Sequence, residues 1–508
     1  MSVSALRGVF AAAALFAVSV ASPASAQGVS KTLLDPKAIE TWADDVFGKA
    51  LAEHRVSGLG ITVTQGDKVL FIKGYGYQDW ATKTTVATDK TQFRIASLTK
   101  TFVATGIVQL LERGQIKSLD EPANKYLKRF QFKQNGGQDI TVWDLLTHRA
   151  GFGTPPQVTA DTSTMKLPVD AKILADYVPG YARPRDSVSV YCNYCWGMLG
   201  VMIEDLSGKT LVDYLREQIF IPLGMNNTEL SVARTQPAGT ITQYAFVPGG
   251  PALATAYPLS TVMTPGAGAI ISTPADMSKW LIANISEGGG TSSKVLSKKS
   301  WQLMHTRHRG NHPETNGFGA AFFLYDYNGE KVMEHYGSLQ HRSMEFMLMD
   351  SKVGVFVTMA GGGKPSPRAD VRGAVPAAVK GGVEPEMSHS GVRALVLDHF
   401  LGTLPYTNDP KADVTIYVGR YRDIPRTPGP TQIPDEITVA ASGDGGLIIG
   451  GRGVYRPSGK DVFTLDRPLD LEAGLMAANR YVFGTDAAGK VTAMYQHVNA
   501  GGYERMGN

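Results

Sequence analysis

The sequence predicts an α/β protein of the α+β type, in which helices flank an antiparallel sheet and a small β-barrel follows at the C-terminus. Three observations lead to this fold class. Runs with β-type composition occur near the start of the chain and return after residue 330, so one shared sheet is expected. Mainly helical segments separate these runs between about residues 140 and 310. Short strands with turn residues between them fill the C-terminal region.

Length and composition agree with two globular domains. The chain has 508 residues, 43% of them apolar and 19% charged, which is enough apolar material for a large core. Its net charge of +4 is spread over many Lys and Arg side chains, and no basic run with interleaved aromatic residues occurs. Nucleic acid is therefore not expected as a partner.

The first residues have the features of a signal peptide. Arg7 precedes an apolar stretch at 8–21, and Ala24-Ser25-Ala26 precedes Gln27, so we expect residues 1–26 to be removed. The apolar stretch is too short to cross a bilayer, and no later run of about 18 apolar residues follows. The mature protein is expected to be exported to the periplasm, with no stable membrane anchor.

The first predicted elements are a hairpin and a helix. Residues 60–64 and 69–75 are β-rich and are joined by Gln65-Gly66-Asp67, which predicts a turn. Residues 97–113 form a predicted helix that ends at Gly114, because apolar side chains recur there at helical spacing. These apolar residues are Phe102, Val103, Ile107, Leu110 and Leu111.

The middle of the chain is predicted to be a mainly helical insertion with long loops that contain Pro and Gly. Helical stretches are expected at 142–147 and 276–285. Runs of β type return at 331–335, 345–350 and 353–359, and we expect them to complete the first sheet.

The C-terminal region is predicted to form a separate β domain. The composition shifts to Gly, Pro, Lys and Ala between residues 361 and 386, and a short helix is expected at 392–400. We place the boundary near residue 405, so that 27–404 form the first domain and 405–508 the second. Short strands, typical of a small barrel or sandwich, are expected at 415–421, 437–441, 447–450, 462–465, 481–483 and 491–495.

The two cysteines of the sequence, Cys192 and Cys195, are spaced as C-x-x-C. A zinc site would need further ligands, and a thioredoxin-like motif would need a βαβ context that this segment lacks. A disulfide and two buried thiols both stay open, because one helical turn brings residues at this spacing together. Redox catalysis is not expected.

A serine and a lysine on one helical turn carry the central chemical signal. In Ser97-Leu98-Thr99-Lys100 the spacing places the amine within reach of the hydroxyl. The positive end of the helix favours an alkoxide and disfavours a second positive charge, so Lys100 is pushed toward its neutral, basic form. A neutral lysine can activate a serine without histidine. A second S-x-x-K at 163–166 lacks a following amphipathic helix and is predicted to be a surface loop.

Two further motifs follow in order along the chain. Tyr191-Cys192-Asn193 precedes a helical run, and His335-Tyr336-Gly337-Ser338 lies on a predicted strand. With the S-x-x-K motif they resemble the serine β-lactamase and penicillin-binding superfamily, in the branch of class C β-lactamases, D-Ala-D-Ala carboxypeptidases, D-aminopeptidases and related esterases. His148 resembles a structural histidine of this family. The resemblance spans about residues 50–362 and includes 74–76, 119–122, 145–148, 222–225 and 272–276.

The resemblance implies a β-lactamase-like fold and a covalent mechanism. Ser97 would be the acylated nucleophile, and Lys100 and Tyr191 would take and return its proton and later activate water. Asn193 would hold a substrate amide. The backbone N–H groups of Ser97 and Ser338 would form the oxyanion hole, whose donors are fixed before the reaction.

The third motif departs from that of most β-lactamases. His335 stands where they usually have the lysine of K-T-G, and His-x-G versions are similar to those of peptidases and esterases. The resemblance assigns His335 to catalysis and Tyr336 and Gly337 to substrate binding, and a packed strand histidine is the alternative. A neutral imidazole attracts a substrate carboxylate less than a lysine does. Gln340-His341-Arg342 replaces the Pro-Gly-Phe of many relatives and is expected to place bulky polar groups near the site.

Together these motifs predict an exported serine hydrolase, in the first place a peptidase on short peptides, including peptides with D-residues. A narrower resemblance is to a peptidase of microcystin breakdown, whose substrate is a linearised peptide. A carboxylesterase or weak β-lactamase of the same fold is the alternative within the class. A non-catalytic binder of peptidoglycan fragments is the alternative from another class.

The expected partner is a small peptide, amide or ester substrate. Neither an H-E-x-x-H nor a G-x-S-x-G pattern occurs, and no metal or cofactor is expected. The segment at 417–421 and the later strands resemble the lipocalin-like β domain that follows some of these hydrolases. Its role and the number of subunits are left open.

Overall fold

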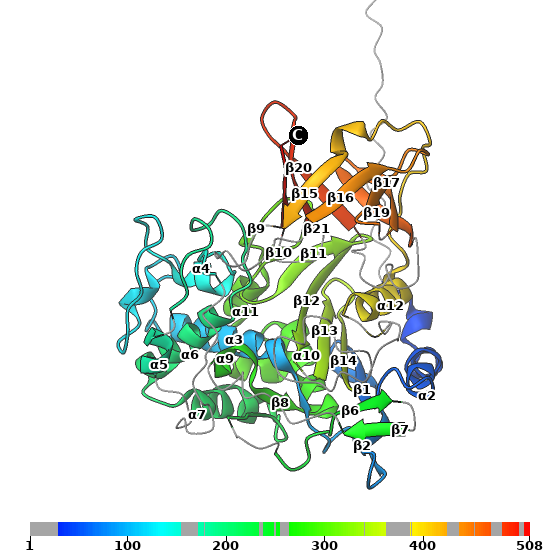
Figure 1. Cartoon of the computed structure of the whole chain (residues 1–508). Helices are drawn as coiled ribbons and strands as arrows, with labels where there is room; N and C mark the ends of the chain where they lie inside the picture. The colour runs from blue at the N-terminus through cyan, green and yellow to red at the C-terminus, as the bar shows by residue number, and fades with distance from the viewer. Residues whose placement is uncertain are drawn as a thin grey trace, which may run out of the picture.

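The computed structural model describes residues 29–153, 171–176, 178–232, 237–247, 250–253, 264–339, 341–361, 387, 389–423, 436–451, 453–468, 480–496 and 502–507. The predicted signal peptide, the second S-x-x-K and Gln340 lie outside these residues. Within the described part of the chain, a nine-stranded antiparallel sheet and a closed eight-stranded barrel are the largest β structures (Figure 1). The predicted fold class is confirmed.

The large sheet brings together strands from both ends of the first region. Its spatial order is β3-β2-β1-β14-β13-β12-β11-β10-β9. The central pair is antiparallel, with Gly58 opposite Ala360, so the single shared sheet is as predicted. The strands are β1 (Gly58–Gln65), β2 (Lys68–Asp79), β3 (Thr84–Thr85), β9 (Arg309–Gly310), β10 (Gly317–Phe318), β11 (Phe323–Tyr327), β12 (Glu330–Ser338), β13 (His341–Leu348) and β14 (Val353–Ala360).

Helices precede β1, fill the region between residues 99 and 305, and also follow β14. They are α1 (Pro36–Ala43), α2 (Lys49–Ala52), α3 (Thr99–Glu112), α4 (Val142–Leu146), α5 (Ala171–Asp176), α6 (Asn193–Ser207), α7 (Leu211–Leu215), α8 (Ile221–Leu223), α9 (Pro265–Gly268), α10 (Pro274–Ser286), α11 (Lys298–His305) and α12 (His389–Leu401). Short 3-10 or π segments occur at 31–34, 44–48, 96–98, 123–125, 216–220, 290–294 and 415–417. Within the described ranges, no helix combines the length and hydropathy needed to cross a bilayer.

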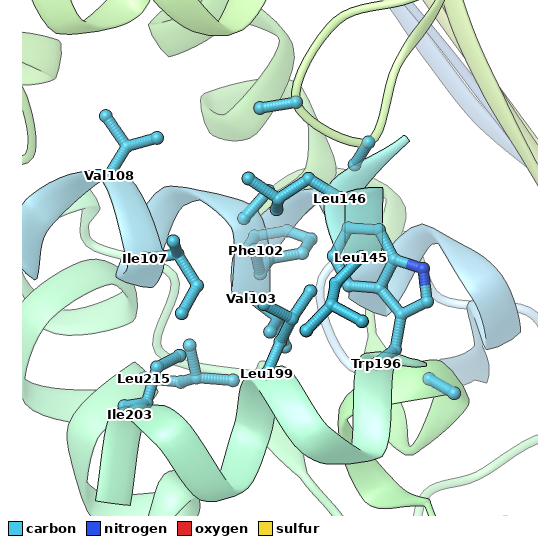
Figure 2. Close-up of a cluster of buried hydrophobic side chains, with 14 of the residues drawn as sticks. Phe102, Val103, Ile107, Val108, Leu145, Leu146, Trp196, Leu199, Ile203 and Leu215 are labelled. Atoms are coloured by element: carbon cyan, nitrogen blue, oxygen red, sulfur yellow. The ribbon is translucent and has the colours of Figure 1, made fainter. Parts of the chain in front are cut away.

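The sheet is buried on both faces. On one face α3 and α10 pack in a large apolar cluster that continues into α6, and on the other face α1 and α12 pack in a second cluster (Figure 1). Figure 2 shows the part of the first cluster where Phe102 and Val103 of α3 meet Leu199 of α6 and Leu145 of α4. Because α3 is buried along nearly its whole length, the residues at its N-terminus are held firmly.

Small sheets complete the first region. The strands β4 (Phe93–Arg94), β8 (Ile270–Ser272) and β5 (Glu229–Leu230) pair in that order, and β6 (Tyr244–Val247) pairs with β7 (Gly250–Leu253). The N–H of Ile95 donates to the carbonyl of Ile270 at 3.1 Å. This pairing fixes the chain immediately before α3.

The C-terminal barrel is filled by its own side chains. Its strands are β15 (Gly419–Asp423), β16 (Glu436–Ala441), β17 (Leu447–Ile449), β18 (Gly453–Gly459), β19 (Val462–Pro468), β20 (Arg480–Thr485), β21 (Val491–Gln496) and β22 (Gly502–Arg505). Aromatic residues contribute most of the buried interior, namely Tyr417, Tyr421, Tyr455, Phe463, Tyr481 and Phe483. The barrel therefore has a packed core, and of the two predicted architectures the barrel is the correct one.

Two details of the barrel differ from the prediction. The start of the predicted strand at 415–421 is a 3-10 turn over Thr415–Tyr417, because the Asp413 carboxylate accepts hydrogen bonds from both the N–H and the hydroxyl of Thr415. The strands β18 and β22 were not predicted. Their sequences are rich in Gly, Pro, Arg and Glu, so they lack the β-branched composition that marks a strand.

Candidate active site

The nucleophile candidate is placed by a short turn at the start of α3. Ser97 lies in the 3-10 segment Ala96–Leu98 that leads into α3, and its side chain is half-buried. Ala96 has a φ of 51°, a left-handed conformation that is costly for a residue with a Cβ. Such local strain is typical of positions that the surrounding structure holds for a functional reason.

A buried lysine lies next to this serine, as the S-x-x-K spacing predicts. Lys100 Nζ is 2.9 Å from Ser97 Oγ and donates a hydrogen bond of 2.6 Å to the Ala267 carbonyl. The residue is completely buried, and burial holds the pKa of its amine well below the usual range. A neutral amine has a lone pair, so it can accept the hydroxyl proton of Ser97.

The ring of Tyr191 lies close to this lysine. Lys100 Nζ is 5.0 Å from the centroid of the Tyr191 ring, which also stacks on His148 at a centroid distance of 4.4 Å. Nδ1 of His148 accepts the Cys192 N–H at 3.0 Å. His148 thus holds both the ring and the backbone of the tyrosine motif, which is the kind of contact expected of a structural histidine.

A disulfide closes the first turn of the helix that follows. Cys192 and Cys195 are paired, so of the two states left open by the sequence the structure has the disulfide. Cys192 is also the N-cap of α6, and its sulfur accepts the Cys195 N–H. Asn193, the first residue of α6, is exposed between the two bonded cysteines, where a substrate can reach it.

His335 reaches the site from the sheet. It lies on β12, is completely buried, and its Nδ1–H donates to the Tyr336 carbonyl at 2.8 Å. Burial, together with the nearby Lys100, lowers the pKa of the imidazole to about 3. The ring is therefore neutral, and its Nε2 carries a lone pair that accepts no hydrogen bond from any described residue.

Gly337 brings β12 into contact with the start of α3. A Cβ at this position would lie 2.1 Å from the Ile95 carbonyl oxygen and 3.0 Å from the Ser97 nitrogen, so a side chain has no room. The two backbones consequently touch, and Ser338 follows directly. The two N–H groups predicted for the oxyanion hole, those of Ser97 and Ser338, belong to these two segments.

Comparison with known proteins identifies the family of the chain. The Beta-lactamase family model matches residues 43–380, two thirds of the chain. The chain belongs to the Beta-lactamase family. A penicillin-binding protein of Bacillus subtilis is 29% identical over 201 residues, which are 38% of this chain and 42% of that protein. The chain thus matches less than half the length of this relative.

Two solved structures share the fold of this Beta-lactamase family member. The octameric penicillin-binding protein homologue from Pyrococcus abyssi covers 92% of this chain and is itself covered to 98%, with a TM-score of 0.54 and 20% identity. The β-lactamase/D-alanine carboxypeptidase from Yersinia pestis covers 73% of this chain and is covered to 99%, with a TM-score of 0.55 and 19% identity.

The residues around the third motif depart from what the sequence indicates. Tyr336 stacks on Phe323 at a centroid distance of 5.5 Å. His341 is buried, and its Nδ1 accepts the Arg94 N–H at 2.9 Å, so it supports β4 and does not add an exposed polar group. Arg342 donates to the Met387 carbonyl at 2.9 Å, toward α12.

Three contacts of the site could not be found from the sequence. The Ala267 carbonyl binds Lys100, Glu345 lies directly opposite His335 on β13, and the His389 Nε2 binds the Gly337 carbonyl at 2.9 Å. No local motif marks any of these residues. The contacts of Ala267 and His389 join residues 167 and 52 positions apart, and the opposition of Glu345 and His335 depends on the register of the β12–β13 hairpin. In the described ranges, no group of three or more His, Cys, Asp or Glu side chains is arranged to hold a metal ion.

Proposed function

We propose that the protein is an exported serine hydrolase that forms an acyl intermediate on Ser97 and cleaves short peptides, including peptides with D-residues. One observation carries the proposal: Ser97 Oγ lies 2.9 Å from the Nζ of a lysine that is buried and has a lowered pKa. A hydroxyl beside a neutral amine is an activated nucleophile. Membership of the Beta-lactamase family supports the same chemistry.

In the acylation step Ser97 Oγ attacks the substrate carbonyl carbon while Lys100 Nζ accepts the hydroxyl proton. The bond from carbon to the leaving nitrogen or oxygen then breaks, and the proton passes from Lys100 to the leaving group, with Tyr191 beside the path. Water attacks the resulting ester and releases a carboxylic acid, and the proton returns to Ser97. No further co-reactant is needed.

The negative charge on the carbonyl oxygen needs two donors. The N–H groups of Ser97 and Ser338 are suited to this role because Gly337 permits close contact between their segments. Donors of this kind are preorganised, and loss of one costs about 10²- to 10³-fold in rate. Side-chain substitution at Ser338 would leave its N–H in place.

The charge of the third motif supports a peptidase or esterase over an efficient β-lactamase. His335 has a pKa of about 3, so it is neutral near neutral pH and offers no positive charge to a substrate carboxylate. Carboxylesterase or weak β-lactamase activity of the same fold is the second candidate function. The buried lysine beside Ser97 counts against a binder without turnover, since a binder needs no deprotonated amine.

The test is intact-protein mass spectrometry after exposure to a fluorophosphonate or a β-lactam. We expect one adduct on the wild type, none on Ser97→Ala, and an unchanged adduct on Ser163→Ala, which removes the serine of the second S-x-x-K. Turnover of D- and L-aminoacyl peptides, p-nitrophenyl esters and a linearised microcystin-type peptide then separates the substrate classes. Absence of both an adduct and turnover would favour the binder of peptidoglycan fragments.

A further inference from the structure

The helix α12 contacts β12 directly behind the site. Two of its side chains, His389 and Arg393, are one turn apart and so lie on the same helical face. Arg393 forms a bidentate ion pair with the buried carboxylate of Glu334, with N–O distances of 2.6 to 3.0 Å. Its guanidinium also lies 5.8 Å from the centroid of the Tyr336 ring. Arg393 therefore anchors α12 to the strand.

His389 makes a different contact, to the backbone of the strand. Its Nε2 lies 2.9 Å from the Gly337 carbonyl oxygen, and because a carbonyl can only accept, Nε2 carries the hydrogen. The ring also packs against Tyr336 at a centroid distance of 5.1 Å. Burial lowers the pKa of His389 to about 4, so the neutral form that makes this single donation persists near neutral pH.

The geometry of the peptide bond connects this contact to the site. The Gly337 carbonyl and the Ser338 N–H belong to one planar trans unit, so they point in opposite directions. Gly337 also pairs with Ser343 of β13, so a donor from α12 adds to the restraint on its carbonyl and thereby on the direction of the Ser338 N–H. Hydrogen bonding to the carbonyl also polarises the unit and makes the N–H a stronger donor.

We propose that His389 is a positioning residue of the oxyanion hole, which holds the Gly337 carbonyl so that the Ser338 N–H points at the acyl oxygen. This inference rests on the proposed function, because it takes the Ser338 N–H as an oxyanion donor. His389 itself does not touch the substrate. Arg393 supplies the anchoring of the helix, so the contribution of His389 is separable from packing.

The experiment compares three variants of the full chain. His389→Leu removes the donor, and His389→Gln places an amide N–H near the position of Nε2. His399→Leu is the matched control, because His399 lies on the same helix but stacks on Trp42 at 4.2 Å, away from Gly337. Burst release of p-nitrophenolate from a p-nitrophenyl ester measures acylation, and thermal melting shows that each variant folds.

We expect His389→Leu to lower the acylation rate constant about tenfold with little change in KM, since the donor is misdirected but not lost. His389→Gln should recover most of the rate, and His399→Leu should match the wild type. The infrared band of the acyl carbonyl on Ser97 should move to higher wavenumber in His389→Leu and back in His389→Gln. A purely structural role would not move this band.

The outcomes separate the two proposals. A wild type that is never acylated overturns the proposed function and with it the role of His389. Normal acylation of the wild type together with an unmoved carbonyl band in a folded His389→Leu leaves the proposed function intact and overturns the role of His389. An equal rate loss in His399→Leu would likewise assign the effect to helix packing and overturn it.

Discussion

Buried ionisable side chains have different partners on the two faces of β12. On the face toward α12, the carboxylate of Glu334 is compensated by Arg393 and by the hydroxyl of Tyr325, which donates at 2.6 Å. On the face toward α3, His335 and the opposite Glu345 are equally buried, and neither has an ion-pair partner among the described residues. Burial lowers the pKa of His335 to about 3 and raises that of Glu345 to about 8.

The presence or absence of a counter-charge decides which protonation state burial favours on each face. On the α12 face, Arg393 supplies a counter-charge to the buried Glu334 carboxylate and Tyr325 supplies a hydrogen bond. On the α3 face, burial without an ion-pair partner favours the neutral forms of His335 and Glu345. Burial favours the neutral form of Lys100 in the same way. Of these groups, Glu345 titrates near neutral pH because its pKa is about 8, whereas His335 stays neutral there. The α12 face of β12 thus carries a compensated ion pair, and its α3 face carries the groups that we propose to surround the reaction.

The largest expected effect is on the α3 face, from Lys100→Met. Without the amine that accepts the Ser97 proton, the acylation rate should fall about 10²- to 10⁴-fold. Lys100→Arg should not restore it, because a guanidinium stays charged and cannot take a proton. Both are measured by burst kinetics with a p-nitrophenyl ester. Acylation of Lys100→Met at the wild-type rate would contradict the assignment.

On the α12 face the corresponding change should affect stability. Arg393→Met leaves the Glu334 carboxylate buried and unpaired, and we expect the free energy of unfolding to fall by about 3–5 kcal/mol. The double variant Glu334→Met with Arg393→Met should recover much of this loss, because no charge is then left uncompensated. Urea unfolding of the two variants and the wild type gives the comparison. A double variant as unstable as Arg393→Met would show that packing, not charge, is what was lost.

The contact between Ser97 and Lys100 could be predicted from the sequence. Ser97 and Lys100 are three residues apart, where the 3-10 turn leads into α3, so their contact follows from helical spacing. The hairpin of β1 and β2 and the strands β12 and β14 were found for a similar local reason, since their composition and turn residues are distinctive. The order of the three motifs then led to the family.

What the sequence could not predict depends on strand register and on the docking of segments that lie apart in the chain. The opposition of His335 and Glu345 is set by the register of β12 against β13, and a shift of one residue would separate them. The approach of His389 to Gly337 requires the docked position of α12. The disulfide state of Cys192 was equally open, because spacing permits it without requiring it.

An intermediate effect is expected from Glu345→Gln, as a dependence of stability on pH. The pKa of Glu345 is raised from 4.5 to about 8 in the folded protein. Between these values the folded state keeps a proton that the unfolded state has lost, so stability falls as pH rises, by at most about 1.4 kcal/mol per pH unit. Glu345→Gln imitates the protonated acid and should remove this slope.

Urea unfolding at several pH values between 5 and 8 measures the slope. Glu112→Gln, an exposed glutamate on α3, is the control and should keep the slope of the wild type. Equal slopes in Glu345→Gln and the wild type would mean that Glu345 is ionised when folded, and the contrast between the two faces would be lost.

The smallest expected effect returns to the α12 face, with Tyr325→Phe. The variant removes one donor to Glu334, but Arg393 still contacts both carboxylate oxygens. We therefore expect a loss of about 1.5 kcal/mol in the free energy of unfolding, which is at the low end for a hydrogen bond to a charged group. Introduced together with Arg393→Met, the same change should cost more, because the hydroxyl is then the main remaining partner of a buried charge. Simple additivity of the two changes would mean that Arg393 and Tyr325 stabilise β12 independently, and that Glu334 is not the centre of one compensated network.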